Sequence, residues 1–264
     1  SKNDALYLKN GDKKYIPPVD LFTDRFEVDF PKIGKLDVYP NRNSIDYIDI
    51  YNVSEVKTMY RGTFRLKGWS ETMDAMKRLE LLDENRTDLT GKTWADLLAM
   101  KIGASAIGIK ESVAKHLNLA TNSVAINAME WLGLFSNEPM NRTIDSPFEV
   151  VSDKMIEKMS MESTDRDMVV MLHSFLASYP DGKKEVIQSR MLDYGSLDAD
   201  TAVARTVALP AAIAVEMILS KQIKLKGVYR PVLAEIYNPI LDRLEDMNIR
   251  MIEEYGLSAS KQIG

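Results

Sequence analysis

Two short segments carry arginines in a pattern suited to acidic ligands. Asn41 and Arg42 directly follow a strand-like run, and Arg61, Thr63 and Arg65 alternate within a second one. Because side chains of a strand point alternately to its two faces, these last three share one face. An arginine held at a strand end presents a rigid fork to a carboxylate, with each charge-assisted bond contributing on the order of 1.5–3 kcal/mol. Two such arginines suit a ligand with several carboxylates.

The spacing of these residues alone leaves a second interpretation open. A cationic strand face that is solvated and paired with surface acids has the same pattern, and such pairs contribute little to stability. Deciding between the two interpretations requires evidence from the rest of the chain.

Several kinds of chemistry lack their residues in this sequence. There is no cysteine, which excludes disulfides and thiolate catalysis, and His116 and His173 stand far apart without a metal-binding motif. We therefore expect no metal site. The segment 103–108 carries the nearest glycine pair to a dinucleotide fingerprint, but its spacing and its position after a helix are both wrong. No Walker sequence or G-x-S-x-G elbow occurs. The motifs favour a binding or assembly domain without catalytic residues of its own.

Composition narrows the class of protein further. The 264 residues are 45% hydrophobic and 28% charged, an ordinary balance for a folded soluble domain. The net charge of −5, from 34 basic and 39 acidic residues, argues against a nucleic-acid partner. No stretch approaches the roughly 18 apolar residues of a membrane span, so we expect no membrane partner and an intracellular location.

The first part of the chain has the pattern of β-structure. Two strand-like runs, 5–8 and 13–16, flank Asn10-Gly11, a dipeptide typical of a tight hairpin turn. Further strands are expected at 36–39 and 58–66. In the second strand, Gly62 indicates that another part of the protein or a ligand approaches the backbone closely. The type of the segment 47–51 stays open.

Helical periodicity begins at residue 70. Helices are predicted from Ser70 onward, after the capping box at Thr93 and Asp96, at 112–119, and at 123–134, where Trp131 and Leu132 are expected as core anchors. A second hairpin follows, with strands at 168–172 and 185–188. The last part is predicted helical, at 201–219, where Pro210 should kink or restart the helix, and at 236–254.

Five segments of this sequence, in order, resemble those of saccharopine dehydrogenases. YPNRNS at 39–44, YRGTFRLKGW at 60–69 and EWLGL at 130–134 resemble PNRDS, RGTLRYKG and EWLGL of that family. The segments at 167–171 and 204–212 resemble two more. The resemblance extends from about residue 36 to about 244, with Phe64 in place of the usual Leu, Asn43 in place of Asp and Ala208 in place of Gly.

This resemblance implies a substrate and the residues that contact it. In the family, the arginine of PNR and the three residues TLR contact saccharopine, a compound with three carboxylates. These positions are Arg42, Thr63, Phe64 and Arg65 here, and Asn41 stands beside them. The implied reaction oxidises saccharopine with NAD or NADP to L-glutamate and aminoadipate semialdehyde in lysine metabolism, by an enzyme that forms a homodimer. The expected location is cytoplasmic, or mitochondrial for a degradative eukaryotic enzyme.

The implied fold is α+β, with a mixed, mostly antiparallel sheet. Residues 1–69 and 138–199 would form the saccharopine-binding and dimerisation domain, residues 70–137 an all-helical insertion, and residues 200–264 helices that would pack on a missing Rossmann domain. Because the family's nucleotide-binding strands have no counterpart here, we expect this chain by itself not to turn over substrate. Two other interpretations are a stand-alone dimerisation or ligand-sensing module, and a sister enzyme acting on a carboxylated polyamine.

Overall fold

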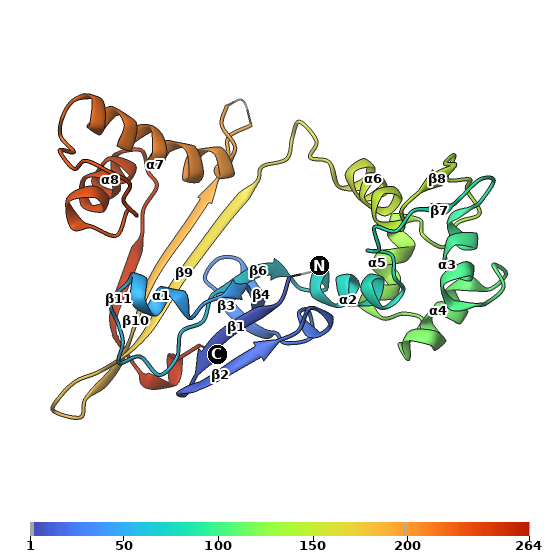
Figure 1. Ribbon diagram of the computed structural model, residues 1–264, viewed down its shortest axis with the longest axis horizontal. Helices are drawn as coiled ribbons and strands as arrows, with labels where there is room; N and C mark the ends of the chain where they lie inside the picture. Colours follow the sequence, from blue (N-terminus) through green and yellow to red (C-terminus); the bar gives the residue numbers. More distant parts are fainter. Residues whose placement is uncertain (1–2, 198, 264) are drawn as a thin grey trace. The chain divides into compact units, whose positions relative to one another are not determined.

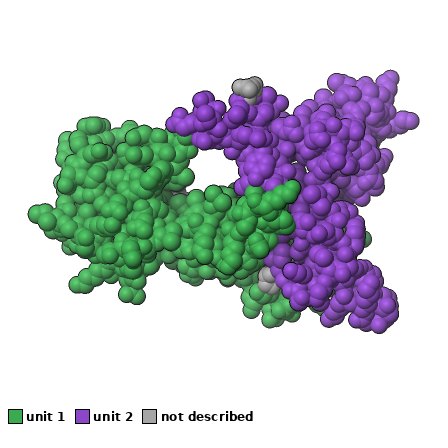
Figure 2. Space-filling model, turned by 180° about the vertical axis from the view of Figure 1, so that it is seen from behind, with its two compact units in different colours: residues 1–160 green, residues 161–264 purple. Residues whose placement is uncertain are grey.

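The computed structural model describes residues 3–197 and 199–263. The chain divides into two compact units, Ser1–Ser160 and Met161–Gly264, which Figure 2 shows in different colours. Both units combine helices with small three-stranded sheets (Figure 1), and all strand pairs among the described residues are antiparallel except β1 with β5. The expected α+β fold with mostly antiparallel sheets is therefore confirmed. The division into three domains given above stays a prediction.

The chain begins with the predicted hairpin. Strands β1 (Ala5–Lys9) and β2 (Asp12–Ile16) pair antiparallel, and the turn residues Asn10 and Gly11 have φ of 53° and 91°. Both angles lie in the left-handed region that this turn requires. On the other side of β1, the short strand β5 (Arg42–Asn43) pairs in parallel. The hairpin thus gives Arg42 a fixed backbone position.

A second sheet of the first unit has the order β3-β4-β6. Its strands are β3 (Phe26–Phe30), which sequence analysis missed, β4 (Gly34–Pro40) and β6 (Gly62–Leu66). The prediction of a strand from residue 58 was wrong at its start, because Met59 forms only an isolated bridge to Leu8. The 3₁₀ helix η1 (Pro18–Asp20) precedes this sheet. The segment 47–51, whose secondary structure the sequence left undecided, lies mostly in helix α1 (Asp46–Ile50).

Gly62 occupies the position where the backbone passes close to its neighbours. A Cβ atom built there would lie 2.3 Å from Cγ1 of Val38 and 3.3 Å from the carbonyl oxygen of Tyr39. Val38 is β-branched and buried in β4, so it cannot move aside cheaply. The expectation of a close approach at this glycine is confirmed.

The rest of the first unit is mainly helical. Thr93 and Asp96 form the predicted capping box, and α5 ends at Gly133 with φ of 86°. Trp131, expected in the core, is instead 58% exposed, because the buried face of α5 carries other residues. The elements are α2 (Trp69–Arg78), α3 (Trp94–Ile102), α4 (Ile109–Leu117), α5 (Val124–Leu132) and α6 (Pro147–Met159), with a short pair β7 (Thr87–Asp88) and β8 (Ile144–Asp145).

These helices enclose the largest hydrophobic core of the chain among the described residues. Its side chains come from all five helices at three- and four-residue spacing, the pattern of an amphipathic helix. Fully buried members include Met76, Leu97, Leu98, Val113, Ile126 and Met129. The core therefore fixes the direction of α2, whose first residues belong to the pocket described below.

The second unit is a three-stranded sheet covered by two helices. Strands β9 (Met168–Ser178) and β10 (Lys184–Tyr194) form the predicted second hairpin, with β11 (Ile252–Leu257) on the other side of β10. Helices α7 (Ala202–Leu219) and α8 (Ala234–Asp246) pack on it, and η2 (Ala259–Lys261) follows. The predicted helix over 236–254 was wrong at its end, because residues 252–254 pair with β10.

Helix α7 departs from two expectations. It continues through Pro210 rather than restarting there. By length and composition it is also apolar enough to cross a membrane. The expectation that no stretch approaches the roughly 18 apolar residues of a membrane span was therefore wrong. Only 17% of the helix is buried, although Ile213 and Met217 lie in the core beside Met191 of β10.

Candidate functional site

The first unit contains a pocket of about 490 Å³. Both aromatic and charged side chains line it, and volumes of this size are typical of small-molecule sites. Residues that carry the argument below are Phe22, Tyr39, Asn41, Arg42, Trp69 and Lys77. They come from the loop after η1, the end of β4, β5 and helix α2, so the two sheets and the helical core together determine the pocket.

Three aromatic rings of the pocket form one cluster. Tyr39 and Trp69 are stacked, with ring centroids 5.8 Å apart and an interplanar angle of 12°. Phe22 meets both rings edge to face, at 5.3 Å from Tyr39 and 5.4 Å from Trp69. Such geometry is favourable beyond the area that it buries. The three rings therefore hold one another in place and give the pocket an apolar wall.

Arg42 projects from β5 beside this cluster. Its φ of 54° is in the left-handed region, and the Asn41 backbone N–H donates to the carbonyl oxygen of Arg61 at 2.9 Å. Arg42 is exposed and forms no ion pair or side-chain hydrogen bond with the described residues. The structure therefore brings Asn41 and Arg42 to the pocket, with the guanidinium group of Arg42 open to a ligand.

The three predicted residues of β6 do not line this pocket. Thr63 lies opposite Tyr39 in the sheet register and Arg65 lies opposite Asp37, so Thr63 and Arg65 share one sheet face. The Arg65 guanidinium lies over Trp69, 4.7 Å from the ring centroid, and donates to the carbonyl oxygen of Phe64 at 3.0 Å. Arg65 therefore contacts the wall of the pocket through Trp69.

Phe64 points to the other face of the same sheet. Its ring packs edge to face against Phe30 at 6.1 Å, and its register partner is Val38. The side chain is thus part of the sheet's packing. The ring of Phe64 is therefore directed to the sheet's packing and not to the pocket.

Arg25 joins the elements that carry the three rings, a role that sequence analysis missed. Its guanidinium donates to the carbonyl oxygen of Phe22 at 3.1 Å and to Glu71 at 2.7 Å, and its Nε lies 3.6 Å from Asp37. Asp37 precedes Tyr39 by two residues, and Glu71 follows Trp69 by two. One arginine thus ties the loop, β4 and α2 together.

The carboxyl group of Asp37 is the most perturbed member of this network. Its residue is 3% exposed. Burial raises the pKa of Asp37, the neighbouring Glu71 charge raises that pKa further, and Arg25 offsets only part of the effect. The network therefore holds a buried acid whose ionised form is incompletely compensated.

Lys77, also missed by sequence analysis, lines the pocket from the last turn of α2. Its ammonium group donates to the carbonyl oxygen of Pro18 and lies 5.6 Å from the centre of the Phe22 ring. Burial lowers the pKa of Lys77. A cation lies at this end of the pocket, in addition to Arg42.

Comparison with known proteins identifies the family. Residues 1–249 match the model of the saccharopine dehydrogenase C-terminal domain, which is nearly the whole chain. The chain belongs to this family.

Relatives of the saccharopine dehydrogenase family are considerably longer than this chain. A mouse protein named mitochondrial alpha-aminoadipic semialdehyde synthase is 34% identical over 223 residues, 82% of this chain and 24% of its own length. The NADP(+), L-glutamate-forming saccharopine dehydrogenase of Saccharomyces cerevisiae is 30% identical over 257 residues, 93% of this chain and 56% of its own. The solved apo structure of the L-Glu-forming enzyme from Saccharomyces cerevisiae superposes with a TM-score of 0.87 at 28% identity, covering 96% of this chain and 59% of that one.

The described part of this family member does not fit the phosphates of a dinucleotide. Such a site needs a glycine-rich turn between a parallel strand and a helix. Gly103 ends α3 and Gly108 precedes α4, so this glycine pair lies between two helices. The parallel pair β1 and β5 is joined to no helix of that kind, and no group of three or more His, Asp or Glu among the described residues could hold a metal.

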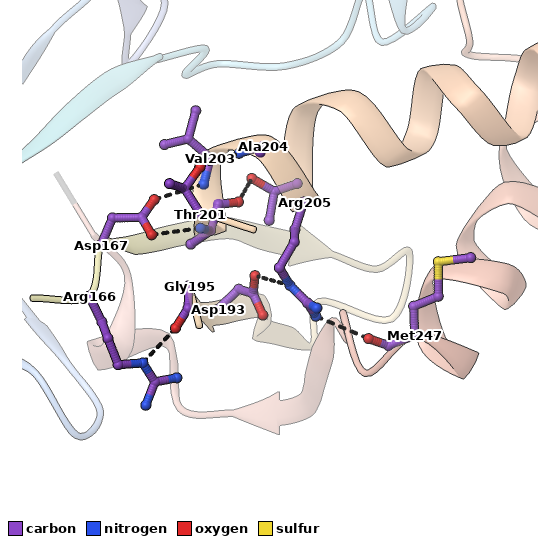
Figure 3. Close-up of polar contacts among 11 residues, drawn as sticks. Arg166, Asp167, Asp193, Gly195, Thr201, Val203, Ala204, Arg205 and Met247 are labelled. Carbon is purple, nitrogen blue, oxygen red and sulfur yellow. Dashed lines mark hydrogen bonds and ion pairs between the residues drawn. The ribbon is translucent and has the colours of Figure 1, made fainter. Parts of the chain in front are cut away.

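Two of the segments that resemble the family meet in the second unit, where they hold the fold together (Figure 3). Asp167, just before β9, accepts from the backbone N–H groups of Ala202 at 2.6 Å and Val203 at 2.9 Å. Arg205 donates to Asp193 of β10 at 3.1 Å and to the carbonyl oxygen of Met247 at 3.0 Å. These contacts fasten the start of α7 to the hairpin.

The same contacts leave no anion site at the start of α7. The N–H of Ala204 is taken by the side chain of Thr201 at 3.0 Å, and those of the two residues before it are taken by Asp167. The free N–H groups that make a helix start attractive to anions are therefore used internally. These two segments do not form a second ligand site.

Proposed function

We propose that this chain is the substrate-binding part of a saccharopine dehydrogenase, which oxidises saccharopine to L-glutamate and aminoadipate semialdehyde with NAD or NADP. Family membership supports the enzyme class. Homodimeric assembly belongs to the same proposal. The cofactor would be bound mainly by a domain outside this chain, because the described residues do not fit its phosphates.

The observation that carries the proposal is the position of Arg42. Its guanidinium lies at an aromatic pocket and has no acidic partner among the described residues. An arginine fork matches a carboxylate in geometry and charge, and saccharopine has three carboxylates joined by carbon chains. The rings of Tyr39 and Trp69 would contact those chains while Arg42 holds one end.

The work of this chain in the reaction would be orientation. The nicotinamide, when bound, would accept a hydride from saccharopine, whereas the residues of this chain would hold the substrate still. Arg42, Thr63, the backbone of Phe64 and Arg65 are the proposed contacts, with Asn41 beside them. Fixing a substrate in one geometry can lower a barrier by several kcal/mol.

Titration calorimetry of the chain with saccharopine tests this proposal. We expect Arg42→Lys to weaken binding by about ten-fold, because lysine keeps the charge but loses the fork. Arg230→Lys is the matched control, since Arg230 is exposed and outside the pocket. Equal affinities of both variants and the original chain would contradict the proposed site.

Two further measurements separate the other interpretations. Turnover of saccharopine with NAD or NADP by the protein in which this chain occurs would support the enzyme. Tighter binding of a carboxylated polyamine than of saccharopine would favour the sister enzyme, and ligand binding without any turnover would favour a sensing module.

A further inference from the structure

We propose that Lys77 is a second carboxylate-binding residue of the pocket, which contacts a different carboxylate of the ligand from the one held by Arg42. This inference rests on the proposed function and extends it to substrate specificity. The ligand class that it implies is an amino acid conjugate with carboxylates at both ends of a carbon chain.

Helix α2 places Lys77 two turns away from Trp69 along the pocket wall. Trp69, Met73 and Lys77 follow each other at four-residue spacing, and all three line the pocket. From Trp69 to Lys77 the helix rises about 12 Å. Arg65 lies on the ring of Trp69 at the start of this helix, whereas Lys77 is two turns further along. Lys77 therefore lines a different part of the pocket wall from Trp69, where a second carboxylate of a long ligand can meet it.

The ammonium group of Lys77 also has no ion-pair partner among the described residues. Its hydrogen-bond partner is a neutral carbonyl oxygen, that of Pro18, and no carboxylate of the described residues lies within ion-pair distance. An ammonium group has three donors, so two remain. Keeping a half-buried cation without a counterion costs free energy, which an incoming carboxylate would recover.

The charged groups around Lys77 favour a ligand with amines as well as carboxylates. Asp74 on the same helix and Asp20 in η1 act on Lys77 from a distance and partly counter the effect of burial on its pKa. Acidic residues also line the pocket, and their negative charges suit the amino groups of such a ligand. They are Asp4, bonded to Tyr15, Glu80, paired with Lys101, Asp83, bonded to Asn85, and Glu84.

Three variants of the full chain test the proposal by calorimetry with saccharopine. We expect Lys77→Gln to weaken binding about ten-fold and Lys77→Arg to retain most of the affinity. Arg78→Gln, the control, removes a charge from the same turn of α2. Because Arg78 donates to the carbonyl oxygen of Leu117 and does not line the pocket, this variant should bind saccharopine as tightly as the original chain.

A proton measurement separates binding from a merely structural role. A bound carboxylate raises the pKa of Lys77, so binding above about pH 9 should take up a proton. The dependence of the binding enthalpy on buffer ionisation reports this uptake. Lys77→Gln should show less uptake than the original chain with the same ligand, whereas Arg78→Gln should show the same uptake.

The outcomes distinguish this inference from the proposed function. Absence of saccharopine binding by the original chain would overturn both. Binding that depends on Arg42 but is equal in Lys77→Gln, with unchanged proton uptake, would overturn the role of Lys77 alone. Circular dichroism and thermal unfolding of each variant establish that it is folded before its affinity is compared.

Discussion

The guanidinium group of Arg65 lies 4.7 Å from the centroid of the Trp69 ring. Trp69 lines the pocket, and Arg65 does not. The ring is stacked on Tyr39 and held edge to face by Phe22, so its position is fixed by two neighbours. Trp69 is therefore the residue through which a charge on β6 is held against the wall of the pocket.

Replacing Trp69 should weaken ligand binding through Arg65. Trp69→Leu keeps an apolar side chain but removes the face on which the guanidinium rests, a contact of about 1 kcal/mol. We expect saccharopine affinity to fall roughly five-fold. Trp131→Leu is the matched control, because that ring is 58% exposed and outside the pocket. Calorimetry that finds the same affinity for both variants would show that Arg65 does not depend on Trp69.

Local patterns predicted the parts of the fold that form from neighbouring residues. The turn at Asn10 and Gly11 and the capping box of Thr93 and Asp96 each depend on residues within a few positions of one another. Strand β11 depends on β10, more than 60 residues away for the pair Arg190 and Ile252, and its sequence alone continued a helical pattern. The pairing with β10, and not the local pattern, therefore determines the secondary structure of β11.

Helix α6 was missed although a signal was present. Ser146 accepts from the N–H of Glu149 at 3.1 Å, and Pro147 occupies the first turn. A serine, then proline, with glutamate three residues after the serine is a recognised start of a helix. The residues at the start of α6 therefore carry enough local information to predict this helix.

The candidate site could be predicted only from residues in or next to predicted strands. Arg42 stood out because it follows one strand directly, and Thr63 and Arg65 because they alternate within another. Arg25 and Lys77 reach their partners across 46 and 59 residues of sequence, to Glu71 and to the carbonyl of Pro18. No periodicity connects residues so far apart, so these roles could come only from the fold.

Loss of Arg25 should destabilise the first unit. In Arg25→Gln, Asp37 and Glu71 would remain as partly buried acids without their shared cation, at a cost of about 2 kcal/mol. Urea unfolding measures this loss. The double variant Arg25→Gln with Asp37→Asn should recover part of it, because one uncompensated charge is then gone. Strictly additive losses would show that Arg25 and Asp37 do not interact.

The raised pKa of Asp37 predicts a particular pH dependence of stability. Because burial raises this pKa, the folded chain binds the proton more tightly than the unfolded chain does. The contribution to stability is complete below the ordinary aspartate pKa of about 4, and it is lost as pH rises through the raised value.

Unfolding of Asp37→Asn in urea between about pH 3.5 and 7 checks this sign. The variant cannot ionise at this position, so its stability relative to the original chain should increase as pH rises. Asp29→Asn on β3 is exposed and controls for the general loss of a charge. A stability difference that is constant across this range would exclude Asp37 as the source of the pH dependence.

The second unit should depend on Asp167 in the opposite pH direction. Burial opposes ionisation of Asp167, but hydrogen bonds from the N–H groups of Val203 and Ala202 outweigh it and lower the pKa of this carboxyl group. A lowered pKa stabilises the fold above the ordinary aspartate range, and the effect disappears as pH falls through the folded value.

Asp167→Ala should therefore lower the thermal unfolding temperature at neutral pH, because two N–H groups at the start of α7 lose their acceptor. The difference from the original chain should shrink below about pH 4. Asp242→Ala on α8 is the control, since Asp242 is exposed and in the same unit. Hydrogen exchange of the Ala202 and Val203 amides gives the local readout. Unchanged protection of both amides in Asp167→Ala would mean that the carboxylate does not hold the start of the helix.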